Sequence, residues 1–200
     1  MTGLYSAFCK FAIVPSVALV CASGVPSPAA AQTISVVVIG DNNIRGKGVL
    51  PSQAYPAQLE RALHARGIDA RVINAGRNGD TAVSVLHRLD TLVPDGTDVA
   101  VVSVGVNDVV YDGVDPDASR ANVREIGRRL EERGIEVVLL PTGGRFQGTL
   151  AARPELHIEP GSGPKPGTTE WHLTPEGYAI LAERDLPRVM DAIARAQTRQ

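Results

Sequence analysis

The stretch ISVVVIG, residues 34–40, decides the fold class of this chain. It is an apolar, mostly β-branched run that ends at a glycine, and it shows no alternation between a polar and an apolar face. A strand with this pattern is buried on both faces, which is typical of a parallel sheet covered by helices on each side. The stretch therefore predicts a buried central strand.

Three further apolar runs predict strands, and longer amphipathic segments between them predict helices. The predicted strands are Ala70–Asn74, Val99–Val104 and Glu136–Leu140. The predicted helices are Tyr55–Arg66, Thr81–Leu92, Ala118–Arg133 and a last helix from Thr174 to about Ala196. Strands joined by helix-length connections pair in parallel, because parallel neighbours need a crossover. The sequence thus predicts an α/β fold, in a single domain over residues 32–200.

Residues 1–31 have the pattern of a secretory signal peptide. They contain Lys10, then an apolar run from Phe11 to Ala22, and they end in small residues before Gln32. Cleavage after Ala31 would leave about 169 residues without cysteine and without a stable membrane span. We therefore expect the mature chain to be periplasmic or secreted.

The charge of the chain argues against a nucleic acid partner. Its 20 Lys and Arg residues are balanced by 22 Asp and Glu residues, so no positive field is available to hold a polyphosphate backbone. No phosphate-binding glycine motif follows a strand, and the four histidines lack the spacing of metal ligands. We expect no cofactor and no metal, and a small-molecule ligand.

Polar residues and glycines concentrate where the predicted strands end and the last helix begins. The segments concerned are residues 40–43, 74–81, 105–108 and 171–175. In an open parallel sheet the carboxyl ends of the strands are where ligands bind. Together these segments offer one histidine as an acid or base, glycine turns whose N–H groups can bind an oxyanion, and amide side chains as donors.

Three motifs in this order resemble the SGNH or GDSL hydrolase superfamily, in particular its secreted esterase, thioesterase and lysophospholipase branch. They are NAGRNGDT at residues 74–81, GVND at residues 105–108 and WHLTPEGY at residues 171–178. The resemblance implies a flavodoxin-like three-layer sandwich and a Ser-His-Asp site acting on acyl esters. By position, it assigns the oxyanion donors to Gly79 and Asn107 and the base to His172.

Two residues depart from the pattern of that superfamily. Asn42 stands where the superfamily has its nucleophilic serine, and Thr169, followed by Glu170, stands where it has its aspartate. An amide nitrogen shares its lone pair with the carbonyl group and is a very poor nucleophile toward an ester. His172 would have to act alone or with Glu170 as its acid partner.

Three hypotheses for the function remain open at this point. In the first hypothesis the chain is a pseudoenzyme whose pocket binds an acylated or glycan-like ligand. In the second, His172 activates water for weak hydrolysis of an ester or thioester. In the third hypothesis Asn42 itself reacts, either by deamidation or by autocleavage of the chain between Asn42 and Asn43. Asn42 is also a favourable residue type for capping the helix that follows.

Overall fold

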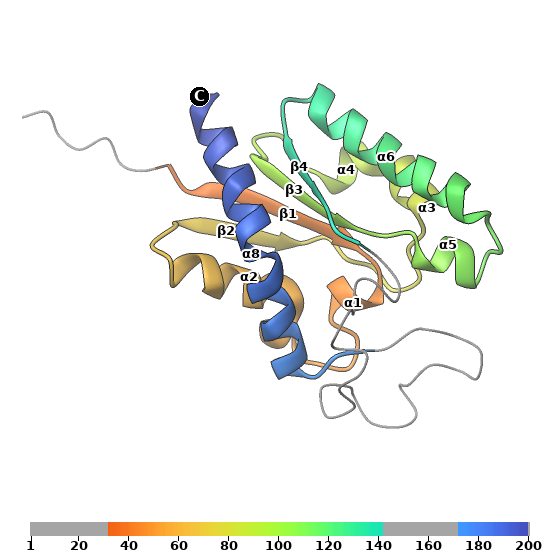
Figure 1. Ribbon diagram of the computed structural model, residues 1–200, viewed down its shortest axis with the longest axis horizontal. Helices are drawn as coiled ribbons and strands as arrows, with labels where there is room; N and C mark the ends of the chain where they lie inside the picture. The colour runs from red at the N-terminus through yellow and green to blue at the C-terminus, as the bar shows by residue number, and fades with distance from the viewer. Residues whose placement is uncertain (1–31, 142–171, 200) are drawn as a thin grey trace, which may run out of the picture. The chain divides into compact units, whose positions relative to one another are not determined.

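The computed structural model describes residues 32–141 and 172–199 of the 200-residue chain. Within these ranges, four parallel strands form one sheet in the order β2-β1-β3-β4 (Figure 1). The strands are β1 (Ile34–Gly40), β2 (Ala70–Asn74), β3 (Val99–Ser103) and β4 (Glu136–Leu139). The predicted signal peptide, Thr169 and Glu170 lie outside the described residues.

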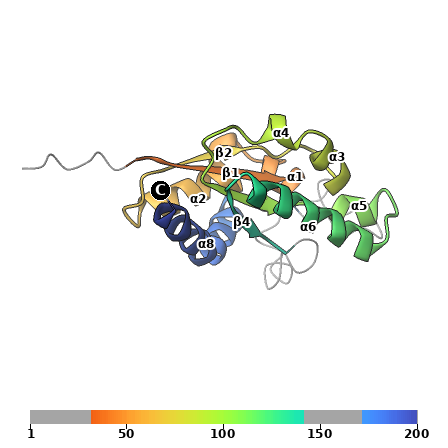
Figure 2. The same cartoon turned by 90° about the horizontal axis from the view of Figure 1, so that it is seen from above.

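Helices connect the strands and cover both faces of the sheet. They are α1 (Asn42–Arg45), α2 (Tyr55–His64), α3 (Ala82–His87), α4 (Leu89–Leu92), α5 (Val106–Val110), α6 (Pro116–Glu132) and α8 (Pro175–Thr198), with a 3-10 turn η1 (Pro51–Gln53). Figure 2 shows the strands between α8 on one side and α3 with α4 on the other. This three-layer α/β arrangement confirms the predicted fold class, a flavodoxin-like sandwich with a parallel sheet.

Strand β1 contributes side chains to two separate hydrophobic cores. Val36 and Val38 join a core with residues of α2 and α8, whereas Val37 and Ile39 join a core with residues of α3, α4 and α6. All four side chains are fully buried. The prediction of a central strand buried on both faces is therefore confirmed.

The predicted helix over Thr81–Leu92 is wrong as a continuous element. The structure ends α3 at His87 and begins α4 at Leu89, with Arg88 between them at φ −129° and ψ 17°. Val85 of α3 and Leu89 of α4 are nonetheless both buried in one core. The break turns the backbone at Arg88, whose side chain forms an ion pair with Asp80.

Helix α1 was not predicted, and glycines allow it to lie against the end of the sheet. A Cβ atom on Gly40 would lie 2.3 Å from Ile44 Cγ1 and 2.5 Å from the Ser103 carbonyl oxygen. A Cβ atom on Gly76 would lie 2.5 Å from the backbone nitrogen of Arg45. Only residues without a Cβ permit this approach, which fixes the position of Asn42 at the start of α1.

No helix within residues 32–141 and 172–199 has the length and apolar character needed to cross a membrane.

Replacing Gly76 with alanine should destabilise the protein by about 1–3 kcal/mol, because the new methyl group overlaps backbone atoms of α1 that cannot rotate away. Chemical unfolding monitored by circular dichroism measures the change. Gly127→Ala is the matched control: its Cβ would meet the Leu139 side chain at 3.6 Å, an ordinary contact between α6 and β4. This control should raise stability by up to about 1 kcal/mol through helix propensity. Equal stabilities for the two variants would contradict the proposed packing of α1.

Candidate active site

Buried polar side chains gather at the carboxyl edge of the sheet, where the sequence predicts the site. Those of Asp41, Asn42 and Asn43 follow β1, and those of Asn107 and Asp108 follow β3. Each of these residues is at most 6% exposed. Burial of so many polar groups is costly unless their hydrogen bonds are satisfied, so their partners define the site.

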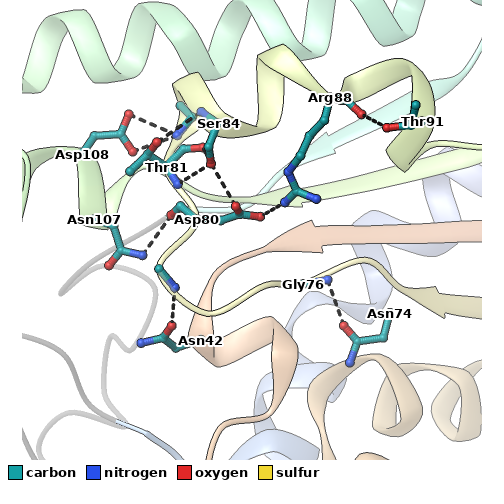
Figure 3. A network of polar contacts seen from close by, with 12 residues as sticks. Asn42, Asn74, Gly76, Asp80, Thr81, Ser84, Arg88, Thr91, Asn107 and Asp108 are labelled. Atoms are coloured by element: carbon teal, nitrogen blue, oxygen red, sulfur yellow. Dashed lines mark hydrogen bonds and ion pairs between the residues drawn. The ribbon is translucent and has the colours of Figure 1, made fainter.

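Asn42 and Gly79 are in direct contact. The backbone N–H of Gly79 donates to Asn42 Oδ1 over 2.8 Å (Figure 3). Gly79 has a φ of 78°, in the left-handed region that glycine adopts without strain. The predicted oxyanion donor is thus bonded to a side-chain carbonyl of the same protein.

Asn42 is held in place by the backbone of α1. Its carbonyl oxygen accepts hydrogen bonds from the N–H groups of Gly46 and Lys47, each over 3.0 Å. The Asp41 carboxylate caps the helix by accepting from the Asn43 N–H, also over 3.0 Å. Asn42 is therefore the first residue of a helical turn rather than its cap, and the predicted capping role belongs to Asp41.

Asn107 is the second predicted donor, and it bonds to the same loop. Its Nδ2 atom donates to the carbonyl oxygen of Asp80 over 2.9 Å, and Nδ2 carries a second hydrogen that this bond does not use. Among the described residues, its buried Oδ1 atom has no hydrogen-bond partner. Within the described part of the chain, Nδ2 is therefore the atom that ties Asn107 to the Gly79 loop.

His172 is buried just before α8, which the Thr174 side chain caps by accepting from the Gly177 N–H over 3.2 Å. Leu173 and Tyr178, on either side of the start of α8, are buried in the same hydrophobic core as Ile44 of α1. Burial is the main reason why the pKa of Tyr178 is raised, and Asp41 raises it further. This places the His172 segment at the same edge of the sheet as Asn42.

Sequence reasoning missed the network that supports the Gly79 loop. The Asp80 carboxylate is paired with Arg88 and accepts a hydrogen bond from Ser84 Oγ over 2.9 Å. Both oxygens of Asp108 accept from the Ala82 N–H, over 3.1 and 2.9 Å. Burial raises the pKa of Asp108, and the Ala82 N–H opposes that rise. In the sequence, Thr81 followed three residues later by Ser84 is a capping pattern, and it indicates that a helix begins directly after the Gly79 loop.

Comparison with known proteins shows which family this sequence is similar to. The sequence profile of the GDSL-like Lipase/Acylhydrolase family matches residues 38–161. Esterase TesA of Pseudomonas aeruginosa is 34% identical over 113 residues, which cover 56% of this chain and 55% of that protein. An arylesterase of Vibrio mimicus is 29% identical over 115 residues, which cover 57% of each protein. The matches therefore span just over half the length of these two relatives.

Among solved structures, a crystal structure of TesA superimposes with a TM-score of 0.62 at 25% identity. The superposition covers 79% of this chain and 99% of that one. The structural match therefore extends well beyond the segment that is similar in sequence.

We expect Asn42→Ala to speed hydrogen exchange at the Gly79 amide by about fivefold, the factor that corresponds to a hydrogen bond worth about 1 kcal/mol. Amide exchange measured by NMR resolves the two neighbouring glycines. The Gly76 amide bonds to Asn74 Oδ1 over 3.0 Å and serves as the internal control, with no change expected. Asn42→Asp keeps an oxygen acceptor and should keep the Gly79 amide protected. Unchanged exchange at Gly79 in Asn42→Ala would contradict the contact.

The raised pKa of Tyr178 predicts a loss of stability at alkaline pH. Above about pH 10 the unfolded chain releases the phenolic proton that the folded protein retains, so unfolding becomes more favourable as the pH rises. Each tyrosine of this kind contributes a slope of up to about 1.4 kcal/mol per pH unit. Tyr178→Phe should remove one such contribution, as measured by urea unfolding between pH 9 and about pH 11. A slope equal to that of the wild type would contradict the assignment.

Proposed function

The chain belongs to the GDSL-like lipase/acylhydrolase family, and on that premise we propose that it binds an acyl ester or thioester in an esterase-like pocket without forming a covalent acyl-enzyme. In this proposal Asn42 occupies the position of the family's nucleophilic serine, and Thr169 that of its aspartate. Gly79 and Asn107 serve as the donors for the acyl carbonyl, and His172 is the base.

The contact between the Gly79 N–H and Asn42 Oδ1, at 2.8 Å, carries the proposal. A carboxamide oxygen is a carbonyl oxygen, so Asn42 supplies from within the protein the type of acceptor that an ester would present. An incoming carbonyl has to displace this oxygen and exchange one neutral hydrogen bond for another. Binding at Gly79 is then weakly favourable at best, and the remaining affinity comes from Asn107 and from contacts to the acyl group.

Slow hydrolysis by water follows from the same arrangement. With Asn42 displaced, His172 accepts a proton from water as the water oxygen attacks the acyl carbon, and the alcohol or thiol leaves with a proton. Donors and binding alone provide about 10³- to 10⁴-fold acceleration over water when a nucleophile is missing. Competition from Asn42 for the Gly79 donor lowers the rate of this protein below that range.

The geometry at α1 argues against the alternative in which Asn42 processes the chain. Succinimide formation requires the Asn43 nitrogen to approach the side-chain carbon of Asn42, but its N–H is held by Asp41 over 3.0 Å. Cleavage before Asn43 requires Asn42 Nδ2 to attack the backbone carbonyl carbon of Asn42. Two hydrogen bonds from the N–H groups of Gly46 and Lys47 hold that carbonyl group and resist the backbone rotation that this attack needs. We therefore favour ligand binding with slow hydrolysis over deamidation and autocleavage.

Ester hydrolysis by the full chain and its Asn42→Ser variant tests the proposed function. The wild type should hydrolyse p-nitrophenyl acetate and butyrate slowly and without a burst, whereas Asn42→Ser should gain at least about 100-fold in kcat/KM and show a burst from the acyl-enzyme. Adding Thr169→Asp to Asn42→Ser should raise the rate further, since the carboxylate supports the imidazolium.

Three controls separate the causes. The first is Asn42→Ala, which frees the Gly79 donor without supplying a hydroxyl and should show no burst. The second is Asn42→Ser combined with His172→Ala, which should lose the activity that Asn42→Ser gains. Intact mass of the exported wild-type protein reads both the first residue, proposed as Gln32, and any change at Asn42. A folded Asn42→Ser variant without activity, or a wild-type protein cleaved or deamidated at Asn42, would refute the proposal.

A further inference from the structure

The loop that carries Gly79 is anchored by a buried carboxylate at the next residue. Asp80 is 3% exposed and forms an ion pair with Arg88, which lies eight positions further along the chain. Ser84 Oγ also donates to this carboxylate over 2.9 Å (Figure 3). A buried carboxylate without partners would be strongly unfavourable, so Arg88 and Ser84 determine where Asp80 can lie.

The backbone of Asp80 links the two predicted donors, Gly79 and Asn107. Its N–H donates to the Arg77 carbonyl oxygen over 3.1 Å, which closes a turn with Gly79 at its third position. The Gly79 N–H takes no part in the bond that closes the turn and donates instead to Asn42 Oδ1 over 2.8 Å. The Asp80 carbonyl oxygen accepts from Asn107 Nδ2 over 2.9 Å. A shift of Asp80 therefore moves the Gly79 N–H and the Asn107 amide together.

Packing at Gly79 itself does not hold the turn. A Cβ atom placed on Gly79 would meet no heavy atom within 4 Å. The restraint comes instead from the residues after it, because the Ala82 N–H is bound by the Asp108 carboxylate. The turn, the start of α3 and the start of α5 thus form one connected polar unit, and the Asp80–Arg88 pair is its charged part.

We propose that Asp80, held by Arg88, is a positioning residue that sets the Gly79 N–H and the Asn107 amide at the separation needed to bind one carbonyl oxygen; this inference rests on the proposed function. Neither Asp80 nor Arg88 touches the ligand. Their effect passes through the backbone of the turn, and it requires charge as well as bulk at position 88.

NMR of the full chain labelled with ¹⁵N tests the positioning directly, without a ligand. Arg88→Ala and Asp80→Asn should shift the Gly79 amide and the Asn107 side-chain resonances and speed Gly79 exchange by about tenfold. Arg88→Lys retains the charge and should recover most of both signals. Arg133→Ala is the matched control, because the side chain of Arg133 is 25% exposed and that of Arg88 27%. Arg133 pairs with Asp95, which lies before β3 and so at the amino ends of the strands.

Kinetics in the Asn42→Ser background provide the second measurement. Arg88→Ala should lower kcat about 10- to 100-fold with KM within about twofold, because displaced donors weaken the transition state more than the bound ester. Arg133→Ala should leave both constants unchanged.

The two measurements separate the failure of this inference from the failure of the proposed function. An inactive Asn42→Ser variant refutes the proposed function, while the NMR result still decides whether Asp80 positions the donors. Folded Arg88→Ala and Asp80→Asn variants whose Gly79 and Asn107 resonances match the wild type would overturn the inference. Equal disturbance by Arg133→Ala would also overturn it, since the effect would then be a general loss of stability.

Discussion

Double-sided burial of β1 is the constraint on which the rest of the structure depends. The strand pairs with β2 on one edge and β3 on the other, and Val36 to Ile39 are fully buried. Each such side chain contributes about 1.5–3 kcal/mol on burial, and a slip by one residue would put either Ser35 in the buried place of Val36 or Gly40 in that of Ile39. The register of β1 is therefore fixed, and so is the point at which the chain leaves the sheet to enter α1.

The site depends on that fixed exit. Gly40 and Gly76 let α1 lie within contact distance of the sheet edge, which brings Asn42 to the Gly79 loop. The loop in turn is supported by groups that belong to α3 and α5 rather than to the strands. A rigid strand thus supplies one side of the candidate site, and a polar network supplies the other.

The parts of the structure that were predictable from sequence are those that local patterns determine. Ala70–Asn74 was predicted with the bounds observed, and β1 is one residue longer than its apolar run, because it includes Gly40. The grouping of buried polar side chains at the carboxyl ends of β1 and β3 also followed from the strand ends. Helix α1 was missed because a four-residue helix has no periodicity to detect, and its place is set by contacts to Gly40 and Gly76.

Two features of the site could not be inferred from local sequence for a different reason. The break at Arg88 interrupts a continuous helical pattern, and Arg88 forms an ion pair with Asp80 at the other end of α3. The bond from Gly79 to Asn42 joins residues 37 positions apart, so no spacing rule reports it. This bond forms only when the loop after β2 meets the start of α1.

Helix α8 has a consequence for the order in which the chain acquires its structure. One of the two cores is completed by nine residues from Leu173 to Ala196, which are the last part of the domain to be synthesised. Until they emerge, the faces of β1 and α2 that they cover remain open to water and to other chains. The nascent domain is thus kept from closing this core until α8 has emerged from the ribosome.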